Sequence, residues 1–174
     1  MTIAPDTDQA TGSAAAATAA RFRAAGEAGD VEAMIQTLAP DVVLRSPITM
    51  LIDIRGHDEM RELLACVFAT IEDIRYFEDF GDDSTRALFY RARVGSQPVE
   101  EASLLRFDED GLVREMTLWF RPLPGLAAVT AGLGPKLIRA RHGRARGALA
   151  AALTRPLRAM TRTGDRVAVR LLRR

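Results

Sequence analysis

Residues 21–47 read RFRAAGEAGDVEAMIQTLAPDVVLRSP, and residues 55–64 read RGHDEMRELL. The pair Gly29-Asp30 ends an Ala-rich helix that begins near Ser13, and Asp30 can cap a second helix. Pro40 and Asp41 end this second helix, and the run VVLRSP then alternates apolar and polar positions in the manner of a strand. A third helix starts at Gly56. This stretch therefore predicts helices that lead into a strand ending at Ser46, followed by another helix.

The remainder of the body reads as strands. The runs are IRYFEDF (74–80), TRALFYRARV (85–94), VEEASLLRF (99–107) and LVREMTLWF (112–120). The segments between them, GDDS, GSQP and DEDG, carry the Gly, Asp, Ser and Pro residues that reverse a chain. Helices followed by antiparallel strands predict an α+β domain over residues 14–122, with helices covering one face of a curved sheet. Residues 1–13 are small and polar, and we expect them to be disordered.

Residues 16–122 resemble the nuclear transport factor 2-like superfamily, in particular its SnoaL-like and ketosteroid-isomerase-like members. The resemblance rests on the RF-to-SP stretch quoted above, on the GHDEM helix start and on the closing LRFDEDGLVREMTLWF hairpin. It implies a cone, in which a bent sheet wraps around the N-terminal helices and encloses an apolar pocket. It also implies that dimers form through the outer face of the sheet.

The same resemblance predicts that the isomerase chemistry is missing. Isomerases of this type place a Tyr on the first helix, where this chain has Phe22. They place an Asp base at the end of the first strand, where this chain has Ser46, and a protonated Asp where it has Ser103. A Ser hydroxyl is a poor general base near neutral pH, and Phe22 has no proton to donate to an oxyanion. No catalytic residue is therefore assigned from the sequence.

Strand alternation from Ser46 and Ser103 predicts which side chains point into the cone. The expected pocket is apolar with a few hydroxyls, which suits a small apolar ligand; its residues are Phe22, Leu44, Ser46, Tyr90, Ser103, Leu105, Met116, Leu118 and Phe120. If the strand at 85–94 has the opposite parity, Arg91 and Arg93 enter the cavity and an anion site results. Glu101 shares the parity of Ser103, although a surface position is the ordinary place for a glutamate.

Other chemistries have no sequence support. His57 and His142 accompany no nucleophile elbow, so a Ser-His-Asp triad is not indicated. The sequence contains no cluster of residues with the spacing of metal ligands and no glycine-rich loop of the kind that binds nucleotide phosphates. No cofactor is therefore expected. Cys66 is the only cysteine, which excludes an internal disulfide and favours a cytoplasmic location. We also find no secretory signal and no apolar run long enough to cross a membrane.

The net charge of +1 conceals two oppositely charged segments. Residues 1–120 contain 11 Arg and 22 Asp or Glu, a formal charge of −11, whereas residues 121–174 contain 13 basic residues and Asp165, a charge of +12. Residues 123–174 are predicted to form a basic helical tail interrupted by Gly and Pro, with a kinked or two-piece helix at Pro156. The tail can pack on the body or a partner subunit, lie on an anionic membrane, or contact nucleic acid. It has no aromatic residue to stack on bases, so nucleic acid is the least favoured partner.

Three functional hypotheses follow from these features. The first is a domain that binds a small apolar molecule without isomerase activity. The second is a SnoaL-like cyclase, isomerase or hydrolase with a non-standard site that uses Glu101, Tyr90 or the two arginines. The third is a dimeric interaction module, in which Trp119 on the outer sheet face forms a homodimer and the tail binds a membrane or a partner.

Overall fold

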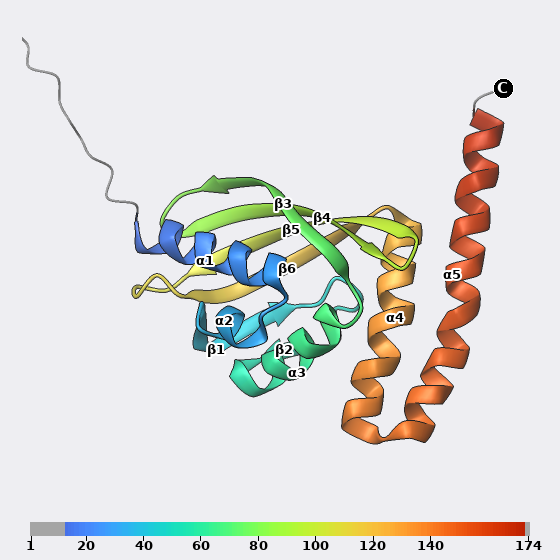
Figure 1. The fold of residues 1–174 in the computed structure, drawn as a ribbon, viewed down its shortest axis with the longest axis horizontal. Coiled ribbons are helices and arrows are strands. Elements are labelled where there is room, and N and C mark those ends of the chain that lie inside the picture. Colours follow the sequence, from blue (N-terminus) through green and yellow to red (C-terminus); the bar gives the residue numbers. More distant parts are fainter. Residues whose placement is uncertain (1–12, 173–174) are drawn as a thin grey trace, which may run out of the picture.

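The computed structural model describes residues 13–172 of the chain as a curved sheet with helices inside its concave side and a helical hairpin at one end (Figure 1). The predicted disorder of residues 1–13 falls, apart from Ser13, outside the described residues. The elements are α1 (Ala14–Ala28), α2 (Val31–Ile35), β1 (Leu38–Arg45), β2 (Asp53–Arg55), α3 (Gly56–Phe68), β3 (Glu72–Gly81), β4 (Thr85–Val94), β5 (Gln97–Phe107), β6 (Val113–Arg121), α4 (Leu123–His142) and α5 (Arg144–Leu172).

The first two helices have the caps that the sequence predicts. The Ser13 Oγ accepts a hydrogen bond of 3.2 Å from the Ala16 N–H, and the Asp30 carboxylate accepts one of 3.0 Å from the Ala33 N–H. Gly29 ends α1 in the left-handed region at φ 68°, where a residue without a Cβ is favoured. These caps fix the point at which the chain turns from α1 into α2.

The second helix is shorter than the VEAMIQTLA pattern suggests. It ends at Ile35, and Leu38 already belongs to β1, where it pairs with Val113. Residues from Leu38 onward pair with β6 instead of extending the helix, because Pro40 has no N–H to continue a helix and β6 has a free edge to pair with. The three-residue strand β2, which pairs with β1, was also not predicted.

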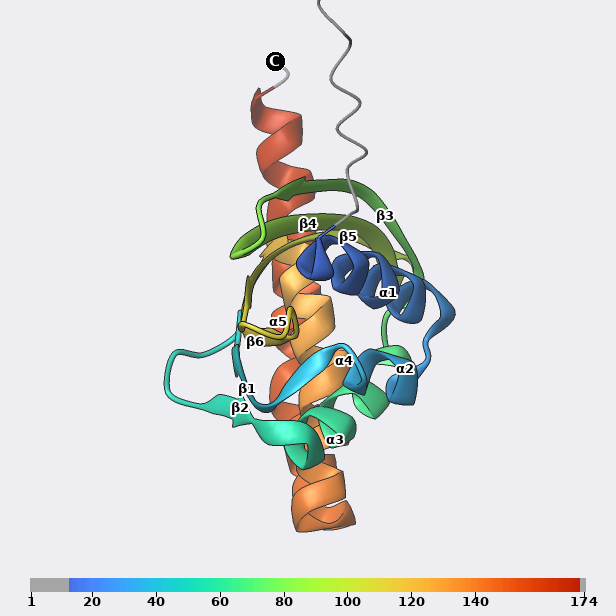
Figure 2. The ribbon, with the colours of Figure 1, turned by 90° about the vertical axis from the view of Figure 1, so that its left-hand side faces the viewer.

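The six strands form one sheet in the order β2-β1-β6-β5-β4-β3. Neighbouring strands are antiparallel except β1 and β6, which run parallel. Register shifts in β1 and β3 mark irregularities in the ladder that help a sheet to bend. Figure 2 shows the result, a sheet that arches over α1 without closing into a barrel, as the α+β prediction requires.

The basic tail forms two helices, α4 and α5. α4 continues through Pro135, and α5 continues through Pro156, so the two-piece helix expected at Pro156 is not seen. The chain reverses at Gly143, and α5 approaches α4 closely at Gly147, where an added Cβ would lie 2.6 Å from the Cβ of Arg139. In Figure 1, α4 lies against the end of the sheet and α5 lies on the far side of α4 from the body.

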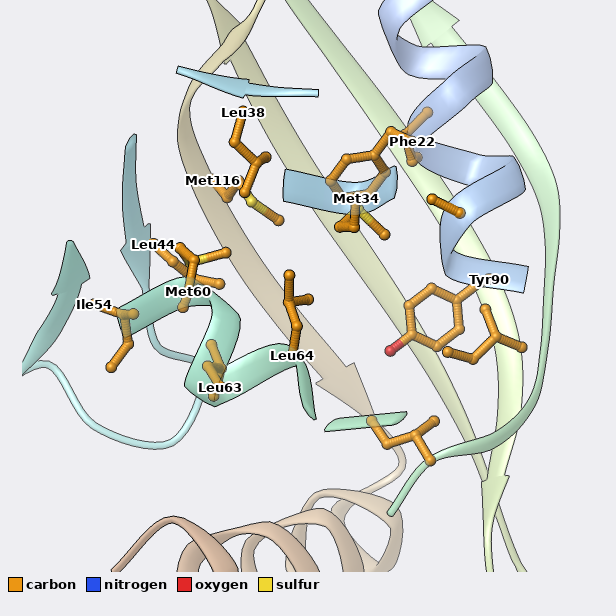
Figure 3. Close-up of a cluster of buried hydrophobic side chains, with 14 of the residues drawn as sticks. Phe22, Met34, Leu38, Leu44, Ile54, Met60, Leu63, Leu64, Tyr90 and Met116 are labelled. Carbon is orange, nitrogen blue, oxygen red and sulfur yellow. The ribbon is translucent and has the colours of Figure 1, made fainter. Parts of the chain in front are cut away.

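The core fills the space between the sheet, α1 and α3. Figure 3 shows Phe22 from α1, the α3 side chains Met60, Leu63 and Leu64, and Tyr90 from β4 converging on one cluster, together with Met116 of β6. α4 joins this core through Ala127, Ala128, Val129 and Leu133, all of which are buried. The first helix of the basic tail is therefore part of the folded body.

Candidate functional site

A cavity of about 360 Å³ opens inside the cone. It lies between the concave face of the sheet, α1, α3 and α4, and its walls are mostly aliphatic and aromatic. The principal side chains that line it are Phe22, Met34, Leu44, Leu63, Leu64, Ile74, Tyr76, Tyr90, Glu101, Met116, Leu118, Phe120, Val129, Leu133 and Leu137. A cavity of this size and lining is suited to a small, largely apolar molecule.

Seven of the nine predicted pocket residues lie on its wall: Phe22, Leu44, Ser46, Tyr90, Met116, Leu118 and Phe120. The other two, Ser103 and Leu105, are buried beneath the wall. Ser103 nevertheless bears on the site, because its hydroxyl bonds to a residue that does line the cavity. That residue is Glu101.

Glu101 is the buried carboxyl group of the cavity. Its side chain lines the pocket, and only 7% of the residue is exposed, so the surface position that is ordinary for a glutamate is wrong here. The hydroxyls of Tyr90 and Ser103 hydrogen-bond to it, the latter over 2.9 Å. Burial raises the pKa of Glu101 to about 7, against the lowering effect of the two hydroxyl donors. A carboxyl with this pKa is half ionised near neutral pH and can both accept and donate a proton.

Two tyrosines surround this carboxyl. The rings of Tyr76 and Tyr90 meet edge to face with centroids 5.4 Å apart, and both line the cavity. Burial, with the negative charge of Glu101 as a smaller cause, raises the pKa of each phenol well above its usual range. Both hydroxyls therefore stay protonated and can serve as hydrogen-bond donors.

Arg91 and Arg93 point away from the cavity. Leu88, Tyr90 and Val94 of β4 are buried, which is the parity that places apolar residues inside. Arg91 lies over the ring of Phe77 and bonds to Glu100 over 3.0 Å, whereas Arg93 pairs with Asp73 and Glu72. The anion site that the opposite parity would have created is therefore absent from this cavity.

The end of the cone is covered by α4 and by the loop after β1. From α4, Leu133, Leu137 and Ile138 line the cavity, and Arg141 and His142 lie at its rim. Arg141 bonds to Glu62 of α3 over 2.6 Å, which ties the end of α4 to the helix opposite. From the loop, Ile48, Thr49 and Ile52 contribute to the wall, while Met50 and Leu51 are almost fully exposed.

At Ser46 the structure shows a local role. Its Oγ accepts a hydrogen bond of 3.1 Å from the Ile48 N–H, so the hydroxyl shapes the turn at the end of β1. The side chain still lines the cavity. Among the described residues that line the cavity, this strand end contributes no carboxyl group, and Phe22 supplies only carbon atoms to the wall. The buried carboxyl group of this cavity comes from β5 instead, with Tyr90 of β4 hydrogen-bonded to it.

The remaining reactive residues lie elsewhere. The Nε2 of His57 is 3.0 Å from the Leu38 carbonyl oxygen, so this ring joins α3 to β1. Burial raises the pKa of the half-buried Cys66 thiol, which makes it less nucleophilic. Within residues 13–172, no group of three His, Cys, Asp or Glu side chains is placed to hold a metal ion. Over the same part of the chain, no helix is long and apolar enough to span a bilayer.

Two groups of wall residues were not assigned from the sequence, although the patterns contain them. Ile74 and Tyr76 alternate in IRYFEDF as an inward pair would. The α4 residues Val129, Leu133 and Leu137 recur every four positions, which marks one helix face. What the sequence does not indicate is that this face closes the cone.

Solved structures with the same fold support this architecture. A steroid delta-isomerase from Pseudomonas aeruginosa is 28% identical with a TM-score of 0.64, and the alignment covers 75% of this chain and 93% of that one. A bacterial protein with a cystatin-like fold from Silicibacter pomeroyi is 24% identical with a TM-score of 0.64, over 74% of this chain and 88% of that one.

The epoxide hydrolase/cyclase-like enzyme SalBIII, of pyran ring formation in salinomycin, is 14% identical with a TM-score of 0.53. That alignment covers 62% of this chain and 90% of that one. At 24% and 14% identity, the similarities to the Silicibacter protein and to SalBIII show the fold alone. A search of the curated proteins found no match.

A family model provides the assignment. The model of the SnoaL-like domain matches residues 19–116, which run from within α1 to the first half of β6 and include Glu101. The predicted resemblance, drawn from 16 to 122, is thereby confirmed. The chain belongs to the SnoaL-like family.

Proposed function

We propose that this protein is an enzyme that transfers a proton on a small, largely apolar substrate, with Glu101 as the general acid-base group. The observation that carries the proposal is a carboxyl of pKa about 7 on the wall of an apolar cavity. General bases are most effective when their pKa lies near the working pH. Strongly shifted carboxyls in cavities are candidates for catalysis on that ground.

The surrounding residues fit such a role. The Tyr90 and Ser103 hydroxyls orient the Glu101 carboxyl, and the Tyr76 phenol lies near enough for the charge of Glu101 to raise the pKa of the phenol. The ionised carboxylate can remove a proton from an acidified C–H bond and return it at another atom. The neutral acid can protonate a leaving or ring oxygen. The names isomerase and hydrolase/cyclase-like, borne by two proteins of similar fold, are consistent with these two reaction types.

A second candidate is a binding protein without chemistry. It is favoured by Phe22 and Ser46, which replace the proton-handling groups expected from the isomerase resemblance. In that case the bonds of Tyr90 and Ser103 to Glu101 would serve only to satisfy a buried polar group. Both candidates share the small apolar ligand, and they differ in whether Glu101 exchanges a proton with it.

A generic proton-abstraction probe separates the two candidates. 5-Nitrobenzisoxazole loses its ring C–H proton to a base while its N–O bond breaks, and the product is a coloured cyanophenolate. We expect the wild-type protein to accelerate this reaction, with a rate that rises with pH through an apparent pKa of about 7. Glu101→Gln should lower the rate by about 100-fold or more.

The matched control is Glu100→Gln, one residue earlier. Glu100 faces the outside of the sheet, where it pairs with Arg91 and Arg121. The proposal fails if both variants retain the wild-type rate. It also fails if the wild-type protein binds the probe, as shown by displacement of N-phenyl-1-naphthylamine, without accelerating its ring opening.

We further propose that two chains associate through the outer sheet face, in the cytoplasm. Trp119 is 53% exposed there on β6, and Phe77 and Phe80 are exposed on β3, the edge strand of the same sheet. Light scattering should give twice the chain mass for the wild type and the single chain mass for Trp119→Glu. A single chain mass for both would remove the dimer.

A further inference from the structure

An exposed apolar stripe runs the length of α5. Its members are spaced by four, seven, seven and four residues, which is the repeat of one helix face, and they are Leu149, Leu153, Met160, Val167 and Leu171. Each is about half exposed or more, and Leu153 is 69% exposed. A row of five large apolar side chains in water is costly for an isolated chain and indicates a missing partner.

The stripe is not the face by which α5 packs on α4. Gly147 is buried against Arg139, and Ala150 and Thr154 are half-buried along the same line. At 100° per residue, this contact line lies about a quarter to a third of a turn from the line of Leu149 and Leu153. The packing of the hairpin therefore leaves the apolar stripe free.

The rest of α5 is basic. Its sequence contains seven Arg and a single acidic residue, Asp165. Arg144 and Arg155 are exposed and lie on the side of the helix opposite Leu153. An apolar stripe with arginines around it, and no span long enough to cross a bilayer among the described residues, is typical of a helix that lies in the plane of a membrane.

The charge decides between the available partners. A second α5 seated on the stripe would bring two strongly positive helices together, which is unfavourable. Nucleic acid would be bound by the arginines, but it would leave the leucines exposed, and residues 121–174 contain no aromatic side chain for base stacking. An anionic bilayer satisfies both features, because the leucines enter the acyl region and the positive charge of α5 is attracted to the anionic headgroups.

We propose that α5 docks this protein on the surface of an anionic lipid bilayer. The proposal is independent of proton transfer by Glu101, since it rests on α5 alone. It has a consequence for the cavity, because apolar molecules partition into bilayers and a pocket held there meets them at a raised local concentration.

Co-sedimentation of the full chain with vesicles tests the proposal. We expect binding to vesicles that contain phosphatidylglycerol, and binding at least about tenfold weaker to pure phosphatidylcholine. Binding should also weaken as salt is raised, since surface charges are screened. Equal binding to both vesicle types, or to neither, overturns the proposal.

Two leucine variants provide a matched pair. Leu153→Glu places a charge in the stripe and should reduce vesicle binding by about tenfold or more. Leu123→Glu, at the start of α4, makes the same change at a helical position that is 67% exposed, against 69% for Leu153, and should leave binding unchanged. Circular dichroism of both variants should match the wild type. Equal losses in the two variants would show that α5 is not the docking element.

An arginine variant and the oligomeric state of Leu153→Glu distinguish a membrane from a second subunit as the partner. Arg144→Glu combined with Arg155→Glu should also weaken binding to the anionic vesicles, because it reverses two of the positive charges that attract α5 to anionic lipids. If Leu153→Glu instead converts a dimer into a monomer in light scattering while vesicle binding persists, the stripe is a subunit interface and the proposal is wrong.

Discussion

The hydroxyl of Ser103 donates a hydrogen bond of 2.9 Å to the Oε1 of Glu101, two residues earlier on the same strand. Both side chains lie on the inner face of β5, since residues i and i+2 of a strand share a face. The Tyr90 hydroxyl bonds to the same carboxyl from the adjacent strand. The two strands thus fix the position of the one carboxyl that the described residues place on the wall of the cavity.

Burial of Glu101 makes folding stability depend on pH. The pKa of this carboxyl rises from 4.5 to about 7 on folding, so the folded state retains a proton that the unfolded state has lost between these values. The contribution of Glu101 to the free energy of unfolding is therefore largest below about pH 4.5. This contribution falls by about 3 kcal/mol as the pH rises to about 7.

Glu101→Gln should abolish that decline, because an amide does not ionise. Urea unfolding at pH 5 and pH 8 should show a smaller loss for the variant than for the wild type, and at pH 8 the variant should be the more stable protein. Parallel pH dependences for the two proteins would contradict the raised pKa.

Tyr90→Phe should raise the pKa of Glu101 further. The Tyr90 hydroxyl stabilises the carboxylate and opposes the effect of burial, so its removal leaves burial less compensated. The midpoint of the pH-rate profile with 5-nitrobenzisoxazole should move to higher pH. Tyr76→Phe should move it less, since Glu101 and Tyr76 interact through charge without a hydrogen bond that affects the carboxyl. A shift toward lower pH in Tyr90→Phe would contradict this arrangement.

Leu118→Trp should fill the cavity and remove ligand binding. Leu118 lines the pocket, and the larger side chain occupies space that a small ligand needs. Thr117→Trp is the control, because its neighbouring position has the opposite parity and does not line the cavity. Titration with N-phenyl-1-naphthylamine should show binding to the control and none to Leu118→Trp. Undiminished binding to both would place the ligand elsewhere.

Arg91→Ala should leave ligand binding and the proton-transfer rate unchanged. The guanidinium lies outside the sheet, on Phe77 and Glu100, and exposed ion pairs contribute little to stability. Melting temperature and dye affinity should both stay close to the wild-type values. A large loss of affinity would require Arg91 to face the cavity and would reverse the parity of β4.

The succession of elements could be predicted from the sequence because each has a local signal. Ser13, Gly29 and Asp30 define the first helices through their own hydrogen bonds and φ angles, and the turns between strands have characteristic compositions. The early end of α2 could not be predicted, because it depends on the pairing of β1 with the distant strand β6. The strand β2 could not be predicted either, because its three residues form a strand only by pairing with β1.

The apolar wall of the cavity follows from strand alternation, whereas the sequence leaves Glu101 between the cavity and the surface. Alternation located Leu44, Tyr90 and Leu118, since apolar side chains on an inward face follow a simple period. The same alternation points Glu101 inward, but the cost of burying a carboxylate made the surface the ordinary expectation. In the structure, hydrogen bonds from Tyr90 and Ser103 and partial protonation offset the free-energy cost of burying this carboxylate. Neither effect can be predicted without knowing which residues surround Glu101 in the fold.

The helix α4 lies outside the segment that defines family membership, yet it supplies a wall of the cavity. The family match ends at residue 116, while Val129, Leu133 and Leu137 line the pocket. Two members can therefore be alike over the whole matched segment and still accept different molecules. For this group of proteins, transferring a substrate from one member to another is sound only when the sequences that follow the last strand have also been compared.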